Sequence, residues 1–343
     1  MPSSTPAASD PPSTVRTHRV TLANTGDTFE VCEGDRILAA ARRAGIWLPY
    51  ECGWGGCGTC KVTVVEGEAD LLFTEAPAVD ARDARRRRMV TCQTTPTSDL
   101  VIKPLWASEQ PRVELPTADH RAQLVDVEEL APEIRRFRFQ LEREAVYRAG
   151  QYAILEVAPG LRRCYSMSDL SGSPVVEFIA KRYERRPGSE QLFALPVGCH
   201  IQVELPYGDM WLREGVRPVV LVAGGTGISP ILALVRQLSA IGDQRPVRVF
   251  YGATTRAELV CWDELGSLVD GMSDGRLYGA LLTPDDSWTG TTGFVTDSLT
   301  PYLEGLADSD IYLAGPPPMV NAVRALLREQ SVQVDRVHYD SFG

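Results

Sequence analysis

Three cysteines lie close together in the glycine-rich stretch YECGWGGCGTCK, namely Cys52, Cys57 and Cys60, and a fourth, Cys92, follows in MVTCQTT. Glycine buries no side chain and loses the most backbone entropy on folding, so the four glycines between Cys52 and Cys60 do not serve packing. Thiolates bind zinc and iron, and glycines let backbone N–H groups come close to a bound group. The stretch therefore predicts a metal centre held by cysteine sulfur.

The spacing Cys52-x4-Cys57-x2-Cys60, with Cys92 further on, is that of the plant-type [2Fe-2S] ferredoxins, which residues 15–106 resemble. The resemblance implies that the four thiolates hold a [2Fe-2S] cluster and that backbone N–H groups tune its potential. A structural zinc site is the alternative. Such sites usually pair two C-x2-C knuckles, and only one occurs here.

The residues around the cysteines predict a β-grasp domain. THRVTLANTGDTFEVCEG indicates two strands about a turn, RILAAARRAGI a helix ending at Gly45, and CKVTVVEGE another strand. Gly53 and Trp54 stand where the family often has a basic residue after the first loop cysteine. We expect the Trp54 indole to pack on its own domain, with contact to an electron acceptor as the alternative.

The composition is that of an ordinary globular protein, with 44% hydrophobic and 23% charged residues among 343, a length that suggests two or three domains. A net charge of −10 argues against nucleic acid or an anionic membrane as the main partner. No apolar run reaches bilayer-spanning length and no secretory signal is apparent, so a cytoplasmic location is expected. Buried packing is expected for the remaining cysteines, Cys32, Cys164, Cys199 and Cys261.

Composition alone distinguishes three further stretches. Residues 1–14, rich in Ser, Pro and Ala, predict a disordered tail, and residues 107–117, ASEQPRVELPT, a linker. Arg85 to Arg88 form an unbroken basic run. A solvated helix face is the expected explanation, and a docking patch for an acidic partner is the alternative.

Short strands separated by turns in residues 118–213 predict an antiparallel β-barrel. Within it, RRCYSMSD contains Arg163, Tyr165 and Ser166, and this R-x-Y-S pattern resembles the ferredoxin–NADP reductase superfamily, whose barrel holds a flavin. The resemblance implies that Arg163 contacts the pyrophosphate, that Tyr165 lies against the isoalloxazine ring, and that Ser166 reaches flavin N5. Tyr165 and Ser166 are the predicted catalytic residues.

A second flavin contact is expected in KRYERRPGSEQLF, where Ser189 begins a helix whose N-terminus would bind phosphate. Arg186 stands where the family usually has its first glycine. FAD is the expected flavin, and FMN remains the alternative.

Residues 214–343 resemble the nicotinamide domain of the same superfamily, a doubly wound parallel sheet. In RPVVLVAGGTGISPILALVRQL a strand leads through Gly224, Gly225, Thr226 and Gly227 into an amphipathic helix, a place where backbone N–H groups meet a dinucleotide pyrophosphate. No Gly-Lys-Ser/Thr follows, so the turn is not a P-loop.

A further turn, AGPPPM, adds Gly315 and Pro316 to the predicted nicotinamide site, with Ala314 where most relatives carry cysteine. The resemblance implies that Phe342, near the C-terminus, covers the flavin. Arg256 would suit the 2′-phosphate of NADPH, whereas Glu258 disfavours it, and NADH is expected.

No Rieske pattern, nucleophile elbow or histidine metal spacing is present, so such a chain moves electrons for another protein to use. The three modules resemble the NADH-dependent reductase components of bacterial multicomponent oxygenases. The resemblance implies transfer from NADH through FAD and the cluster to a terminal oxygenase, with the di-iron alkene, methane or phenol type favoured.

Four alternatives remain open from the sequence: the reductase of a Rieske ring-hydroxylating dioxygenase, that of a deoxysugar dehydratase system, an NAD(P)H oxidase or flavin reductase, and a zinc-stapled interaction module.

Overall fold

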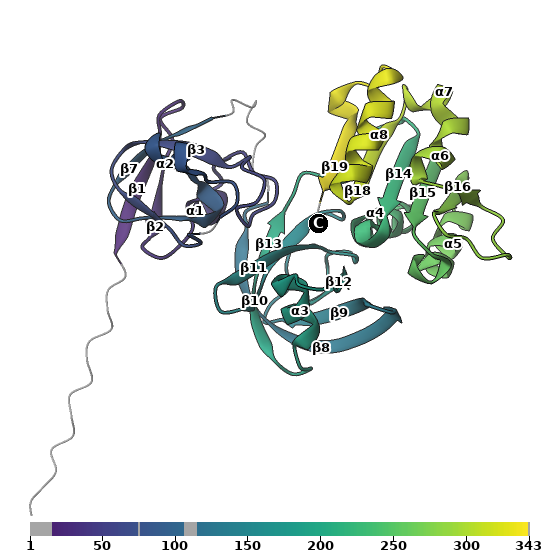
Figure 1. Cartoon of the computed structure of the whole chain (residues 1–343), viewed down its shortest axis with the longest axis horizontal. Coiled ribbons are helices and arrows are strands. Elements are labelled where there is room, and N and C mark those ends of the chain that lie inside the picture. Colours follow the sequence, from purple (N-terminus) through teal and green to yellow (C-terminus); the bar gives the residue numbers. More distant parts are fainter. Residues whose placement is uncertain (1–15, 75, 106–114, 342–343) are drawn as a thin grey trace, which may run out of the picture. The chain divides into compact units, whose positions relative to one another are not determined.

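The computed structural model describes residues 16–74, 76–105 and 115–341, which form two compact units divided between Glu114 and Leu115 (Figure 1). The predicted tail, most of the predicted linker and Phe342 lie outside the described residues. Thr117, at the end of the predicted linker, is buried and donates its hydroxyl to the Pro206 carbonyl at 3.0 Å. It therefore packs with the second unit.

The first unit is built on a five-stranded sheet of order β2-β1-β7-β3-β5, in which β1 and β7 run parallel and the other neighbours antiparallel. Alternation along β1 buries Val20 and Leu22. Helix α1 is buried from Ile37 to Arg42. This is the predicted β-grasp fold. Its elements are β1 (Thr17–Leu22), β2 (Thr28–Cys32), α1 (Ile37–Arg43), β3 (Lys61–Glu66), β4 (Ala69–Leu71), α2 (Ala81–Arg85), β5 (Arg88–Val90), β6 (Thr94–Pro96) and β7 (Leu100–Pro104).

The second unit begins with six antiparallel strands in the order β11-β10-β13-β8-β9-β12. A bridge between Met167 and Phe178 joins the two outer strands, so the sheet closes into the predicted barrel. Phe137, Phe139 and Phe178 fill its core. The elements are β8 (Ala118–Ala131), β9 (Ile134–Leu141), β10 (Tyr152–Ala158), β11 (Leu161–Ser166), β12 (Val175–Lys181), α3 (Pro187–Ala194) and β13 (His200–Tyr207).

The C-terminal part is a parallel sheet of order β17-β16-β15-β14-β18-β19 with helices on both faces, as predicted (Figure 1). Leu221 of β14 packs in one core with α4 and α5, and the next residue, Val222, packs in the other with α6 and α8. The elements are β14 (Val219–Gly224), α4 (Ile228–Ala240), β15 (Val247–Ala253), α5 (Trp262–Asp270), β16 (Gly275–Leu281), β17 (Thr291–Thr292), α6 (Val295–Leu299), α7 (Leu303–Leu306), β18 (Asp310–Gly315), α8 (Pro317–Glu329) and β19 (Val337–Ser341).

The barrel and the parallel sheet share one hydrophobic core. Ile179 and Met210 of the barrel belong to the same buried cluster as Ile231 and Leu234 of α4. The two domains are therefore packed as one body. In the described ranges, no helix combines the length and apolar composition that a bilayer crossing needs.

Two sequence expectations are wrong. The arginine run is not a helix face, because α2 ends at Arg85, Arg87 has a positive φ of 52°, and Arg88 begins β5. Nor are the four remaining cysteines buried: Cys32 is exposed, and the other three are partly exposed. The first error arises because a short run gives no information on where one element ends and the next begins. The second arises because a single cysteine gives no information on which face of its element is covered.

Candidate cofactor sites

The cysteine loop joins α1 to β3, and Cys92 comes from a short 3-10 turn after β5. Cys60 and Cys92 are buried, whereas Cys57 is exposed at the surface of the loop. The backbone N–H of Cys57 points to the Cys52 sulfur at 3.4 Å, and that of Thr59 to the Cys57 sulfur at 3.5 Å. Backbone donors directed at sulfur are the contacts that an iron–sulfur cluster requires of its loop.

The four sulfurs form two pairs. Cys60 and Cys92 approach to 3.3 Å between sulfur atoms, and the Cys57 thiol interacts with that of Cys52, which lowers the pKa of Cys57 to about 6. The hydrogen bond between Cys60 and Cys92 lowers the pKa of the first and raises that of the second. Among the described residues, no three ligating side chains gather around a single metal position. Two thiolate pairs fit two irons better than one zinc ion.

Glycine is needed in this loop for conformation and space. Gly55 has a φ of +96°, and a Cβ there would lie 3.1 Å from Ala76 and from Gln93. A Cβ on Gly56 would lie 2.3 Å from the Trp54 indole. The indole therefore packs against its own loop, in agreement with the expectation for Trp54.

Arg163 lies on β11 against the start of α3. A Cβ on Gly188 would be 2.5 Å from Cγ and 2.6 Å from Nε of Arg163. Because Gly188 has no Cβ, the Arg163 side chain can lie against the N-terminus of α3, and we call this position the cradle. An anion is stabilised at a helix N-terminus. The fold thus brings the two predicted flavin stretches together, which fits a pyrophosphate held between Arg163 and the first turn of α3.

The Ser189 side chain has a local role. Its hydroxyl accepts from the Tyr183 N–H at 3.0 Å and lies 3.1 Å from the Arg186 carbonyl, so it is committed to the turn that precedes α3. The basic residues of the same stretch form ion pairs, Lys181 with Glu258 at 2.6 Å and Arg182 with Glu133. A direct contact from the Ser189 hydroxyl to flavin stays a prediction.

Ser166 joins three segments of the chain. Its hydroxyl donates to Asp340 of β19 at 2.7 Å, and its carbonyl accepts from the Ser229 hydroxyl of α4 at 2.7 Å. Next to it, burial raises the pKa of Tyr165 above its usual range, so the phenol stays neutral. The predicted flavin strand is thereby bonded directly to the helix that follows the glycine turn.

The two predicted nicotinamide turns meet at the carboxyl ends of adjacent parallel strands. β14 and β18 pair in register up to Ala223 and Ala314, and the strand order reverses between them, which is where α/β sheets bind ligands. A Cβ on Gly227 would lie 2.0 Å from the Ala314 carbonyl oxygen. Glycine is therefore required at position 227 for the two turns to touch, and Gly224, Gly225, Thr226, Gly315 and Pro316 are brought to one edge.

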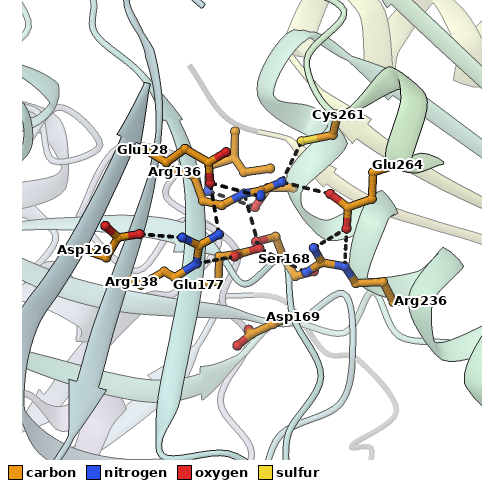
Figure 2. A network of polar contacts seen from close by, with 12 residues as sticks. Asp126, Glu128, Arg136, Arg138, Ser168, Asp169, Glu177, Arg236, Cys261 and Glu264 are labelled. Carbon is orange, nitrogen blue, oxygen red and sulfur yellow. Dashed lines mark hydrogen bonds and ion pairs between the residues drawn. The ribbon is translucent and has the colours of Figure 1, made fainter. Parts of the chain in front are cut away.

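A network of buried and half-buried ion pairs connects the barrel to α4 and α5 (Figure 2). Arg236 of α4 donates to Glu177 at 3.0 Å and to the Ser168 carbonyl at 2.9 Å, both in the barrel. Arg136 of β9 donates at 3.0 Å to Glu264 of α5, which also accepts from Arg236 at 3.0 Å. Glu264 thus lies between two guanidinium groups from different domains.

Glu177 is the buried centre of this network, with 7% of its surface exposed. Burial by itself would raise its pKa, but the charges of Arg136 and Arg236 outweigh it and hold the pKa below its usual range. Arg138 donates to the same carboxylate at 2.9 Å. The paired carboxylate therefore stays ionised.

Sequence reasoning missed Asp340, Ser229 and the whole ion-pair network. Ser229 belongs to the quoted GISP stretch and would have been found by asking what satisfies a polar residue on the buried face of α4. Arg136 and Arg138 alternate with phenylalanines in IRRFRFQL, which places them outside the barrel without showing that helices cover them.

Gly188→Ala tests the cradle. The new methyl group displaces Arg163, and we expect flavin affinity to fall about 10-fold, as for loss of one charge-assisted hydrogen bond. Gly305→Ala in α7 is the matched control, because a Cβ there meets no atom within 4 Å. The measurement is flavin binding to the stripped protein. Equal flavin affinity in the two variants would show that Arg163 does not contribute to flavin binding.

Comparison with known proteins follows the same division of the chain. Family models match residues 20–97 (2Fe-2S iron-sulfur cluster binding domain), 121–211 (oxidoreductase FAD-binding domain) and 221–325 (oxidoreductase NAD-binding domain). The cofactors are accordingly a [2Fe-2S] cluster, FAD and NAD, as predicted.

Relatives match over nearly the whole chain. The ferredoxin–NAD(+) reductase component of the alkene monooxygenase system of Xanthobacter autotrophicus is 33% identical, over 93% of this chain and 99% of its own length. The propane 2-monooxygenase reductase component of Mycolicibacterium smegmatis is 34% identical, over 95% and 97%. The solved ferredoxin reductase in carbazole 1,9a-dioxygenase is 30% identical with a TM-score of 0.85, over 96% and 99%. The chain belongs to the family of three-domain ferredoxin–NAD(+) reductases that includes the reductase components of multicomponent oxygenases.

Proposed function

We propose that this protein takes electrons from NADH and delivers them, through FAD and its [2Fe-2S] cluster, to the terminal oxygenase of a multicomponent monooxygenase. When bound, FAD accepts the two electrons of a hydride together and the cluster passes them on singly. The 2.7 Å hydrogen bond between Ser229 and the Ser166 carbonyl carries the proposal, because it joins the glycine turn of the nicotinamide site to the flavin strand.

The residues of this chain supply binding and orientation. Arg163 and the N-terminus of α3 would hold the flavin pyrophosphate, and Tyr165 offers a neutral, partly buried ring beside it. Gly224 to Gly227 with Gly315 and Pro316 would hold NADH at the switch point. Cys52, Cys57, Cys60 and Cys92 would hold the cluster as two thiolate pairs.

Ser166 is suited to a positioning role as hydride arrives. Its hydroxyl donates a hydrogen bond to the Asp340 carboxylate at 2.7 Å, which fixes the hydroxyl rotamer. The serine oxygen lone pairs are then available to a neighbouring donor such as flavin N5–H. Tyr165 and Ser166 thus remain the residues proposed to contact the reacting ring.

A di-iron monooxygenase is the proposed acceptor class, since alkene and propane monooxygenase reductases are among the relatives. The likeness to the carbazole dioxygenase reductase favours a Rieske-type dioxygenase as the second candidate. Reconstituted hydroxylation with purified components of each class separates them. The zinc-stapled module is disfavoured by the match to a cluster-binding domain.

The test is an anaerobic titration of the purified protein with NADH, followed by visible absorbance. The expected result is bleaching of the flavin bands and then a fall in the broad iron–sulfur absorbance, with both complete at a small excess of NADH. Flavin bleaching with no cluster absorbance present, or with a cluster that stays oxidised, contradicts the proposal.

A further inference from the structure

The arginine run lies at the edge of the cysteine loop. Arg85 ends α2, and Arg88 begins β5, which pairs with β3 directly after Cys60. The run therefore changes direction within four residues and spreads its side chains instead of lining one helix face. Arg82, Arg85 and Arg86 are exposed.

A pocket of about 390 Å³ opens beside the exposed cluster ligand. It is lined by Cys57, Gly58, Thr59, Lys61, Arg88 and Leu105. Among the four predicted cluster ligands, Cys57 is exposed, Cys52 is partly exposed, and Cys60 and Cys92 are buried, so this pocket adjoins the most accessible of the four. A protein that takes electrons from the cluster must approach an exposed edge of it.

The charge at this edge is positive. Lys61 binds Asp83 at 2.7 Å, and Arg88 lies 3.7 Å from the same carboxylate, so one buried anion faces two cations. The guanidinium-rich turn adds Arg82, Arg85 and Arg86. Two other acids lie nearby, Glu51, which accepts from Thr59 at 3.0 Å, and Asp80, which caps α2. With Asp83 they make three acids against the five cations Lys61, Arg82, Arg85, Arg86 and Arg88.

This sign is opposite to that of the whole chain, whose net charge is −10. An acidic protein is repelled by the chain in general and attracted at this edge, which selects both the partner and its orientation. We propose that the cluster-edge cationic surface, formed by Lys61, Arg82, Arg85, Arg86 and Arg88, docks an acidic face of the protein that takes the electrons. The inference rests on the proposed function, since it assumes an external acceptor at the cluster.

The test compares two haem proteins of opposite charge as acceptors, acidic cytochrome b5 and basic cytochrome c. Each NADH gives NAD⁺, a proton and two electrons, which reduce two ferric haems to ferrous. The test variant is Arg85→Glu/Arg86→Glu. The matched control is Arg16→Glu/Arg19→Glu, which makes the same charge change at two exposed positions outside the pocket lining.

At low ionic strength we expect the test variant to reduce cytochrome b5 about 10-fold more slowly and to bind the oxidised cytochrome correspondingly more weakly, with the difference vanishing at high salt. Its reduction of cytochrome c should stay equal or rise, and the control should match the wild type. Haem reduction that persists in a Cys92→Ala protein measures transfer directly from flavin and is subtracted.

Equal cytochrome b5 rates and affinities in the two variants would overturn the proposal. The proposal would also be overturned if NADH reduced the cluster of the test variant as much more slowly as the variant reduces cytochrome b5. The surface would then be needed for electron transfer from residues 115–341 of the same chain to the cluster. A wild-type protein whose cluster is reduced by NADH but passes electrons to neither haem protein would refute the external acceptor itself, and docking with it.

Discussion

Replacing Cys92 by alanine is expected to abolish the cluster while leaving the flavin and nicotinamide domains working. Cys92 is 1% exposed, and its sulfur lies 3.3 Å from that of Cys60, so its loss breaks one of the two thiolate pairs. Residues 115–341 have their own cores and form a separate compact unit. We expect iron and the broad visible absorbance to be lost, electron transfer to protein acceptors to fall to background, and NADH-dependent reduction of a small dye to continue.

Cys32→Ala is the matched control, because Cys32 is exposed at the end of β2 and is not a predicted ligand. It should retain two irons per chain and every activity. Metal analysis also separates the iron–sulfur cluster from a zinc site, since a zinc site gives zinc and no iron–sulfur absorbance beneath the flavin bands. Simultaneous loss of dye reduction and cluster in Cys92→Ala would contradict the modular division of the chain.

Replacing Arg236 by methionine is expected to cost about 3 kcal/mol of unfolding free energy in residues 115–341, the lower end for a broken buried ion pair. The carboxylate of Glu177 loses a 3.0 Å partner but keeps Arg138, and the Ser168 carbonyl loses its donor. Because Arg236 lies on α4, which begins at the glycine turn, hydride transfer should also slow. Chemical denaturation and anaerobic stopped-flow reduction of flavin by NADH measure the two effects.

The loss of stability should depend on pH in a defined direction. The pKa of Glu177 is depressed below its ordinary value of 4.5, so its contribution to stability is present above that value and is lost as pH falls through the depressed pKa. The difference in unfolding free energy between the wild type and Arg236→Met should therefore be greatest near neutral pH and shrink on acidification. Arg328→Met, an exposed position on α8, is the control and should change neither quantity.

Arg236→Lys separates charge from geometry. Lysine keeps the positive charge but cannot donate from a planar fork to Glu177, Ser168 and Glu264 together. We expect stability between those of the wild type and Arg236→Met. Flavin reduction at saturating NADH that is unchanged in all three proteins would show that the network holds the fold without positioning the nicotinamide.

The fold class of each domain could be predicted from the sequence because it depends on local patterns. The cysteine spacing, the strand alternation of THRVTL and the apolar run VVLVAG before the glycine turn each depend on residues close together in the chain. The contacts it could not supply are those between distant residues. Ser166 and Asp340 are 174 residues apart, and Arg136 and Glu264 are 128 apart. No local spacing predicts such a pair.

Local patterns also leave open which partner a side chain takes. The Ser189 hydroxyl bonds to Tyr183 and Arg186 of its own turn, and its contact to the flavin phosphate stays a prediction. The arginine run reads as helical because arginine favours helices, and only the positive φ of Arg87 reveals that the chain turns there. In both cases tertiary structure decides between options that the sequence leaves balanced.

The ion-pair network has a consequence for building chimaeric reductases. A junction near residue 213, between the barrel and the parallel sheet, would keep Arg136 from one parent and take Glu264 from the other, leaving buried charges without their partners. A junction between Glu114 and Leu115 severs no such pair inside residues 115–341. A chimaeric reductase should therefore take its flavin and nicotinamide domains from the same parent and exchange only the ferredoxin domain.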